Sequence, residues 1–62
     1  MSSRAELDSS ATTIDDLLVR ISSAADGYQA GGDEATAADL YEVERSLQAA
    51  RRRLEQVVGR LG

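Results

Sequence analysis

Two adjacent glycines, Gly31 and Gly32, divide the chain close to its midpoint and are followed by Asp33. Adjacent glycines end a helix, because the first of them can adopt the left-handed backbone conformation that closes it. Asp33 offers a carboxylate that can cap a following helix. The chain contains no proline, so little else opposes helix formation. We therefore expect an all-α antiparallel hairpin, with helices over about residues 13–30 and 33–60 and the turn at 31–32.

The second predicted helix carries a regular apolar seam. Its members alternate at spacings of three and four residues, which is the 3.5-residue period of helices that pack along their length. Val58 widens the seam near its end, and either Gly59 or Gly62 could close the helix. The seam consists of Leu40, Val43, Leu47, Ala50, Leu54, Val57 and Leu61.

The first predicted helix has an apolar stripe whose starting point is ambiguous. Thr13 with Asp16 has the spacing of a capping box, and Ser3 with Glu6 marks an earlier start. Serine and threonine pairs between these two points weaken helix, because their hydroxyls compete for backbone groups. We expect a firm helix from about Thr13, and residues 1–12 to be weakly ordered or partly helical. The stripe consists of Ile14, Leu17, Leu18, Ile21, Ala24, Ala25 and Tyr28.

Association with another chain is predicted from the small size of this hairpin. A chain of 62 residues without cysteine or histidine lacks the disulfides and soft metal ligands that stabilise many small domains. If the first helix begins at Thr13, the end of the seam extends past it and stays uncovered, which is typical of an association site. We expect a homodimer that forms a four-helix bundle, or packing on a helical protein partner. The predicted interface residues are Ile14, Leu18, Ile21, Leu40, Val43, Leu47, Leu54, Val57, Val58 and Leu61.

Charge is distributed unevenly along the chain, whose net charge is −4. Residues 45–62 hold five arginines and one acid, whereas residues 1–44 hold ten acids and two arginines. One interpretation is that the basic end pairs with acids of the first helix across the hairpin. The alternative is a nucleic-acid-binding dimer, although the acidic balance and the scarcity of aromatic residues argue against it. The candidate anion contacts are Arg45, Arg51, Arg52 and Arg53.

Catalytic chemistry has few candidate groups here, since the chain lacks cysteine, histidine and lysine. We expect no catalytic residue, no metal, no cofactor and no small-molecule substrate. There is no run of eighteen apolar residues, and the amino terminus lacks the apolar stretch of a signal peptide, so a cytoplasmic location without a membrane span is expected. The sequence thus predicts a small non-catalytic protein–protein interaction module, which could be an adaptor, a regulator or a subunit of a complex.

Overall fold

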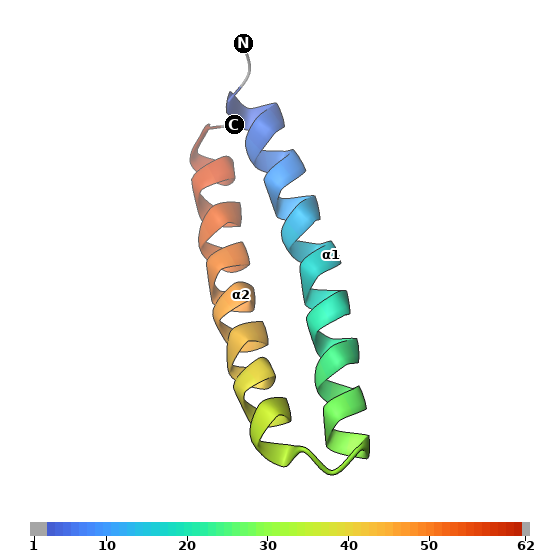
Figure 1. Ribbon diagram of the computed structural model, residues 1–62. Helices are drawn as coiled ribbons and strands as arrows, with labels where there is room; N and C mark the ends of the chain where they lie inside the picture. Colours follow the sequence, from blue (N-terminus) through green and yellow to red (C-terminus); the bar gives the residue numbers. More distant parts are fainter. Residues whose placement is uncertain (1–2, 62) are drawn as a thin grey trace.

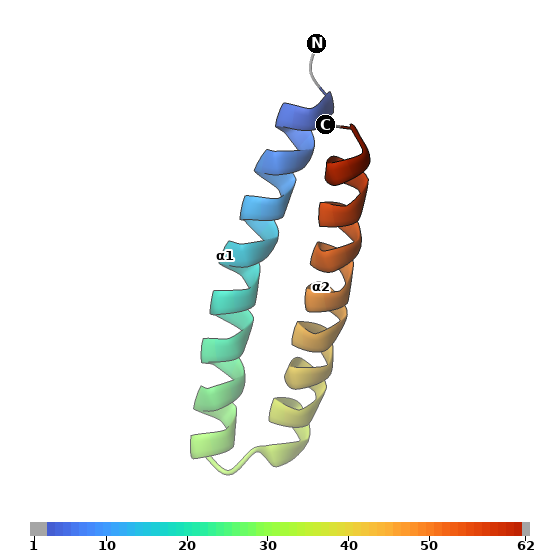
Figure 2. The same cartoon turned by 180° about the vertical axis from the view of Figure 1, so that it is seen from behind.

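A computed structural model describes residues 3–61 as two long helices packed side by side. Helix α1 spans Ser3–Ala30 and helix α2 spans Glu34–Leu61. Both ends of the chain lie at one end of the hairpin and the turn lies at the other, as Figures 1 and 2 show from opposite sides. The molecule measures 47 × 15 × 11 Å. The predicted all-α, two-helix hairpin is confirmed.

The turn lies at the predicted glycine pair. The Asp33 amide donates to the Tyr28 carbonyl oxygen at 2.9 Å, which satisfies a carbonyl at the end of α1. Gly32 has a φ of 88°, so the second glycine, rather than the first, adopts the left-handed conformation. Glycine adopts this conformation without strain, whereas a residue with a side chain does not, and this explains why a glycine occupies the sharp turn at position 32.

Asp33 caps the second helix, as the sequence predicts. Its Oδ1 accepts a hydrogen bond from the Thr36 amide at 3.1 Å. This backbone hydrogen bond, helped by the Thr36 hydroxyl, lowers the pKa of Asp33 below its ordinary value. The cap fixes where α2 begins, and with it the direction in which α2 leaves the turn.

Substitution of Gly32 by alanine tests the role of the left-handed turn. We expect Gly32→Ala to lower the free energy of unfolding by about 1–2 kcal/mol, the cost of a side chain in this backbone conformation. The matched control is Gly27→Ala, since a Cβ at Gly27 meets nothing within 4 Å. That change lies inside α1 and should stabilise the helix by about 0.5–1 kcal/mol. Urea unfolding followed by circular dichroism measures both, and a loss at both positions would contradict the account.

Helix α1 begins at Ser3, earlier than the expected start near Thr13. We expected the serine and threonine hydroxyls of this segment to weaken the helix, but they form hydrogen bonds within it. Those of Ser10, Thr12 and Thr13 donate to backbone carbonyls four residues earlier, at 2.9, 3.3 and 3.1 Å. Such bonds leave the amides free to continue the helical pattern. The expected weak segment is therefore helical from residue 3, and residues 1–2 lie outside the described part of the chain.

The longer α1 covers most of the seam segment that was expected to be bare. Leu7 and Ala11 of α1 are half-buried, and Ala11 and Val58 line the same groove between the helices. On α2, Leu54 and Val58 are half-buried, whereas Leu61 at the end of the seam is 55% exposed. The chain's own first helix thus lies beside this segment, and the expected overhang is reduced to the end of α2.

The hairpin has a thin core. Among the residues whose burial is described, Ala25 and Ala37 are the fully buried hydrophobic ones, and no large side chain is fully buried. Each helix has one neighbour, so its apolar side chains are covered on one side and reach solvent on the other. In the same described region, neither helix is long and apolar enough to cross a membrane.

Candidate interaction surface

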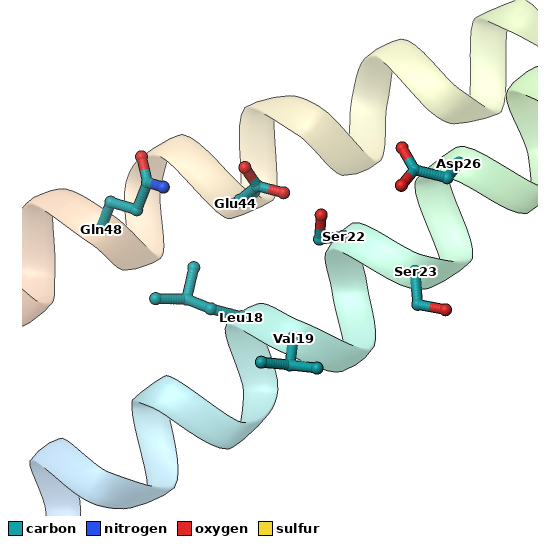
Figure 3. A pocket seen from close by; sticks show the side chains of 7 residues that line it. All are labelled: Leu18, Val19, Ser22, Ser23, Asp26, Glu44 and Gln48. Atoms are coloured by element: carbon teal, nitrogen blue, oxygen red, sulfur yellow. The ribbon is translucent and has the colours of Figure 1, made fainter.

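One broad side of the hairpin is polar, and we call it the polar face. A groove between the helices on this side is lined by Ser22, Asp26, Glu44 and Gln48, together with Leu18 at its floor. Figure 3 shows the polar side chains around this groove, where Val19 and Ser23 point away from α2. Three side-chain hydrogen bonds cross between the helices on this side. Two of them join Arg51 to Asp15, and the third joins Tyr41 to Asp26.

Arg51 makes a two-pronged contact with Asp15 across the hairpin. Its Nε lies 2.5 Å from Asp15 Oδ1 and its Nη2 lies 3.0 Å from Asp15 Oδ2. Arg51 also pairs with Glu55, one turn further along α2. The hydrogen bonds from Arg51 lower the pKa of Asp15 below its ordinary value and raise the pKa of Arg51. The half-buried Arg51 of α2 thus links the two helices near the middle of their length through its hydrogen bonds to Asp15 of α1.

Tyr41 donates a hydrogen bond to Asp26 nearer the turn. Its hydroxyl lies 2.7 Å from Asp26 Oδ1. This bond, and the charges of Asp26 and Glu44 beside it, raise the pKa of the Tyr41 hydroxyl above 10.0. The polar face therefore has its own cross-links between the helices, while one carboxylate oxygen of Glu44 in the groove is buried without a hydrogen-bond partner.

The Asp15–Arg51 contact predicts a pH dependence of stability. A carboxyl whose pKa is lower in the folded state than the ordinary 3.8 stabilises the fold above that value and loses this contribution as the pH falls through the lower value. We expect Asp15→Asn to reduce the free energy of unfolding at about pH 7, and this loss to shrink as the pH falls below 3.8 and through the lowered pKa of Asp15. Thermal unfolding at a series of pH values measures the difference. Asp16→Asn removes the same charge from the neighbouring residue, so equal losses for both variants would contradict the role of Asp15.

The opposite broad side of the hairpin is apolar, and we call it the apolar face. Residues of an α-helix are turned by about 100° from one to the next, so Leu17, Ala24 and Tyr28 lie across α1 from Asp15 and Asp26. The same geometry separates an apolar row on α2 from the polar side chains of that helix. Because the polar rows of the two helices meet on one face, the apolar rows share the other. The apolar face comprises Ile14, Leu17, Ile21, Ala24 and Tyr28 of α1, with Val43, Ala50, Val57 and Leu61 of α2.

Solvent exposure agrees with this division of the faces. Five large apolar side chains are exposed in the described part of the chain, and four of them lie on the apolar face. These are Leu17, Tyr28, Val43 and Leu61, exposed by 38%, 47%, 44% and 55%. The fifth, Val19, is 71% exposed and lies beside the polar groove. Several exposed apolar side chains along one side of a helix pair are typical of an interaction surface.

The predicted interface residues fall into two groups. Leu18, Leu40, Leu47, Leu54 and Val58 lie half-buried in the seam between α1 and α2. Ile14, Ile21 and Val57 are half-buried at the border of the apolar face, and Val43 and Leu61 are exposed on it. The sequence-based set omitted Leu17, Ala24, Tyr28 and Ala50. Tyr28 lies seven residues after Ile21, and Ala50 lies seven residues after Val43, so this spacing could have included these two, whereas Leu17 and Ala24 have it only from each other.

The four candidate arginines do not converge on one site. Arg51 is engaged by Asp15 and Glu55, and Arg45 lies 3.0 Å from Glu42 on its own helix. Arg52 and Arg53 are exposed, but consecutive side chains diverge by about 100° around the helix. The predicted pairing of the basic end with acids of the first helix is thus present at Asp15.

Comparison with protein-family models, with curated proteins and with solved structures gives no match. Within residues 3–61 the structure places no three metal-ligating side chains together. The function must therefore be inferred from the two faces themselves.

Proposed function

We propose that this chain is a protein–protein interaction module that acts through its apolar face. The observation that carries this proposal is the exposure of Leu17, Tyr28, Val43 and Leu61 along one side of a hairpin whose fully buried hydrophobic residues, among those described, are two alanines. Covering these side chains would remove apolar area from water, at roughly 25 cal/mol per Å². A second helical surface is the partner that fits a long, straight strip of this kind.

The polar face supports this proposal by contrast. Arg51 and Asp15 of that face bond to each other across the hairpin, so these two charged groups are less available for recognition by a partner. The same pairing weakens the alternative of nucleic-acid binding, because Arg51 is partly neutralised by two carboxylates of its own chain. With a net charge of −4, long-range attraction to a polyanion is also unfavourable.

Affinity capture from a lysate of the source cells, with and without nuclease, separates the two functions. The bait is the wild-type chain or Val43→Asp, which places a charge on the exposed part of the apolar face. We expect a defined protein to be captured despite nuclease treatment and to be lost with Val43→Asp. Material that disappears on nuclease treatment, or that Val43→Asp retains equally, would contradict the proposal.

A further inference from the structure

We infer that the partner of the apolar face is a second copy of this chain, packed face to face with its turn at the opposite end. This inference rests on the proposed function and adds the identity and the orientation of the partner. Two arrangements place the apolar faces of two hairpins together. A two-fold axis along the hairpin brings both turns to one end, whereas an axis across the hairpin sends them to opposite ends.

Charge distinguishes these two arrangements. Residues 21–44 form the turn end of the hairpin and contain six acids and no base, a net charge of −6. All seven arginines lie in the rest of the chain with five acids, which gives that part a net charge of +2. The six acids of the turn end are Asp26, Asp33, Glu34, Asp39, Glu42 and Glu44.

With both turns at one end, two copies would bring twelve acids together without a single arginine. Packed helices are about 8–10 Å apart, comparable to the distance over which physiological salt screens charge, so this repulsion would be felt. With the turns at opposite ends, the acidic end of each copy lies beside the arginine-bearing end of the other. Charge complementarity therefore favours the second arrangement.

The register of the hairpin shows which residues of α1 and α2 lie at the same level, and the two-fold axis passes through the level at the middle of the apolar face. The pairs Asp15–Arg51 and Asp26–Tyr41 have residue numbers that add to 66 and 67, so such residues lie level on α1 and α2. Leu17 and Ala50 add to 67 and are therefore level, near the middle of the apolar face. An axis at this level places Leu17 opposite its own copy and Ala50 opposite its own copy.

The same axis brings complementary side chains together along α2. Val43 comes opposite Val57 of the partner subunit, so apolar positions meet apolar positions. Asp39 comes next to Arg60 of the partner subunit, which joins the acidic end of one copy to the basic end of the other. Ala50 and Ala24 come opposite Ala50 and Ser10 of the partner subunit, and these small side chains allow the helices to approach closely.

The outline of the face has the size that a specific pair of chains requires. A side of 47 by 15 Å has an outline of about 700 Å² per copy and about 1,400 Å² for two. Specific protein interfaces bury roughly 1,200–2,000 Å² in total. The outline of two such faces therefore falls within the range of these interfaces.

Disulfide cross-linking tests the orientation, because the chain contains no cysteine and each introduced thiol is unique. Under mild oxidation, Leu17→Cys and Ala50→Cys should each form a disulfide-linked dimer nearly completely, since each lies on the axis. Ser10→Cys is the matched control in the same row of α1. Its own copy would lie about 21 Å away, fourteen residues along the helix, which is too far for a disulfide. Position 24 of one copy comes opposite position 10 of the other. A mixture of the Ser10→Cys and Ala24→Cys variants should therefore form a disulfide between the two chains.

Two results would overturn this inference and leave the proposed function standing. The first is a dimer in which Leu17→Cys and Ala50→Cys both stay reduced, or in which Ser10→Cys links to itself. The second is a wild-type chain that remains monomeric, together with a Val43→Asp substitution that still abolishes the capture of another protein. Ala50→Cys changes side-chain volume little, so the outcome does not depend on the larger change at Leu17.

Discussion

Val43→Asp is expected to weaken self-association by at least roughly ten-fold to seventy-fold. Val43 is 44% exposed in the single hairpin, so pairing buries a little under half of its side chain. Full burial of a valine contributes about 1.5–3 kcal/mol, so the part buried on pairing contributes about 0.7–1.3 kcal/mol. A symmetric pair contains the site twice, which gives about 1.3–2.6 kcal/mol, and each 1.4 kcal/mol corresponds to a factor of ten. Burial of an unpaired carboxylate adds to this loss.

Val19→Asp is the matched control for that change. Val19 is also exposed, but it lies beside the polar groove rather than on the apolar face. Both positions have an aspartate four residues earlier, Asp39 for Val43 and Asp15 for Val19, so the added helical repulsion is similar. Dilution calorimetry measures the dissociation of each variant. If the two variants dissociate alike, the apolar face is not the association surface.

Leu47→Ala is expected to have the largest effect on folding. Leu47 is half-buried in the seam of the single hairpin, close to the level where a second copy packs. Truncating a fully buried leucine costs about 2–5 kcal/mol, so a half-buried one costs roughly half of that, and a pair of chains loses roughly 2–5 kcal/mol. That is a large part of the stability of any small protein. We expect most of the helical signal to be lost at micromolar concentration.

Gln48→Ala is the matched control for Leu47→Ala. It introduces the same alanine at the next residue without removing a side chain from the seam, so it separates the loss of packing from any change in helix propensity. Gln48 is exposed at the polar groove, and alanine favours helix at least as well as either residue it replaces. We expect a change of at most about 0.5 kcal/mol for Gln48→Ala. Urea unfolding at matched concentration compares the two variants. Equal stability would mean that the seam is not the main source of stabilisation.

The sequence predicted the fold because its strongest signals are local. Two glycines and an aspartate specify the turn and the cap, and a regular heptad spacing specifies the second helix. The predicted start of α1 near Thr13 differs from the observed start at Ser3, because serine and threonine hydroxyls can form hydrogen bonds in two ways. They compete with the backbone in a free chain, but inside a helix they bond to the carbonyl four residues earlier, as Ser10 does with Glu6. Helix over this segment also half-buries Leu7 and Ala11, and Ala11 lines a groove together with Val58 of α2.

The candidate site was only partly predictable for a related reason. Periodicity indicates which residues are apolar and on which side of a helix they lie, but it does not separate the seam from the neighbouring flank. Leu18 and Leu17 are adjacent in the stripe, yet the first lies in the seam and the second on the apolar face. The polar bonds of Asp15 and Asp26 to α2 fix this rotation, and such cross-helix pairs depend on the register of the folded hairpin.

Sedimentation equilibrium of the wild-type chain over a range of micromolar concentrations tests the central claim most directly. One chain has a mass of 6.6 kDa. We predict a particle of two chains, with helical content and melting temperature that fall together on dilution, because the apolar face is covered only in the pair. A single chain at every concentration, which still unfolds cooperatively at an unchanged temperature, would contradict the account.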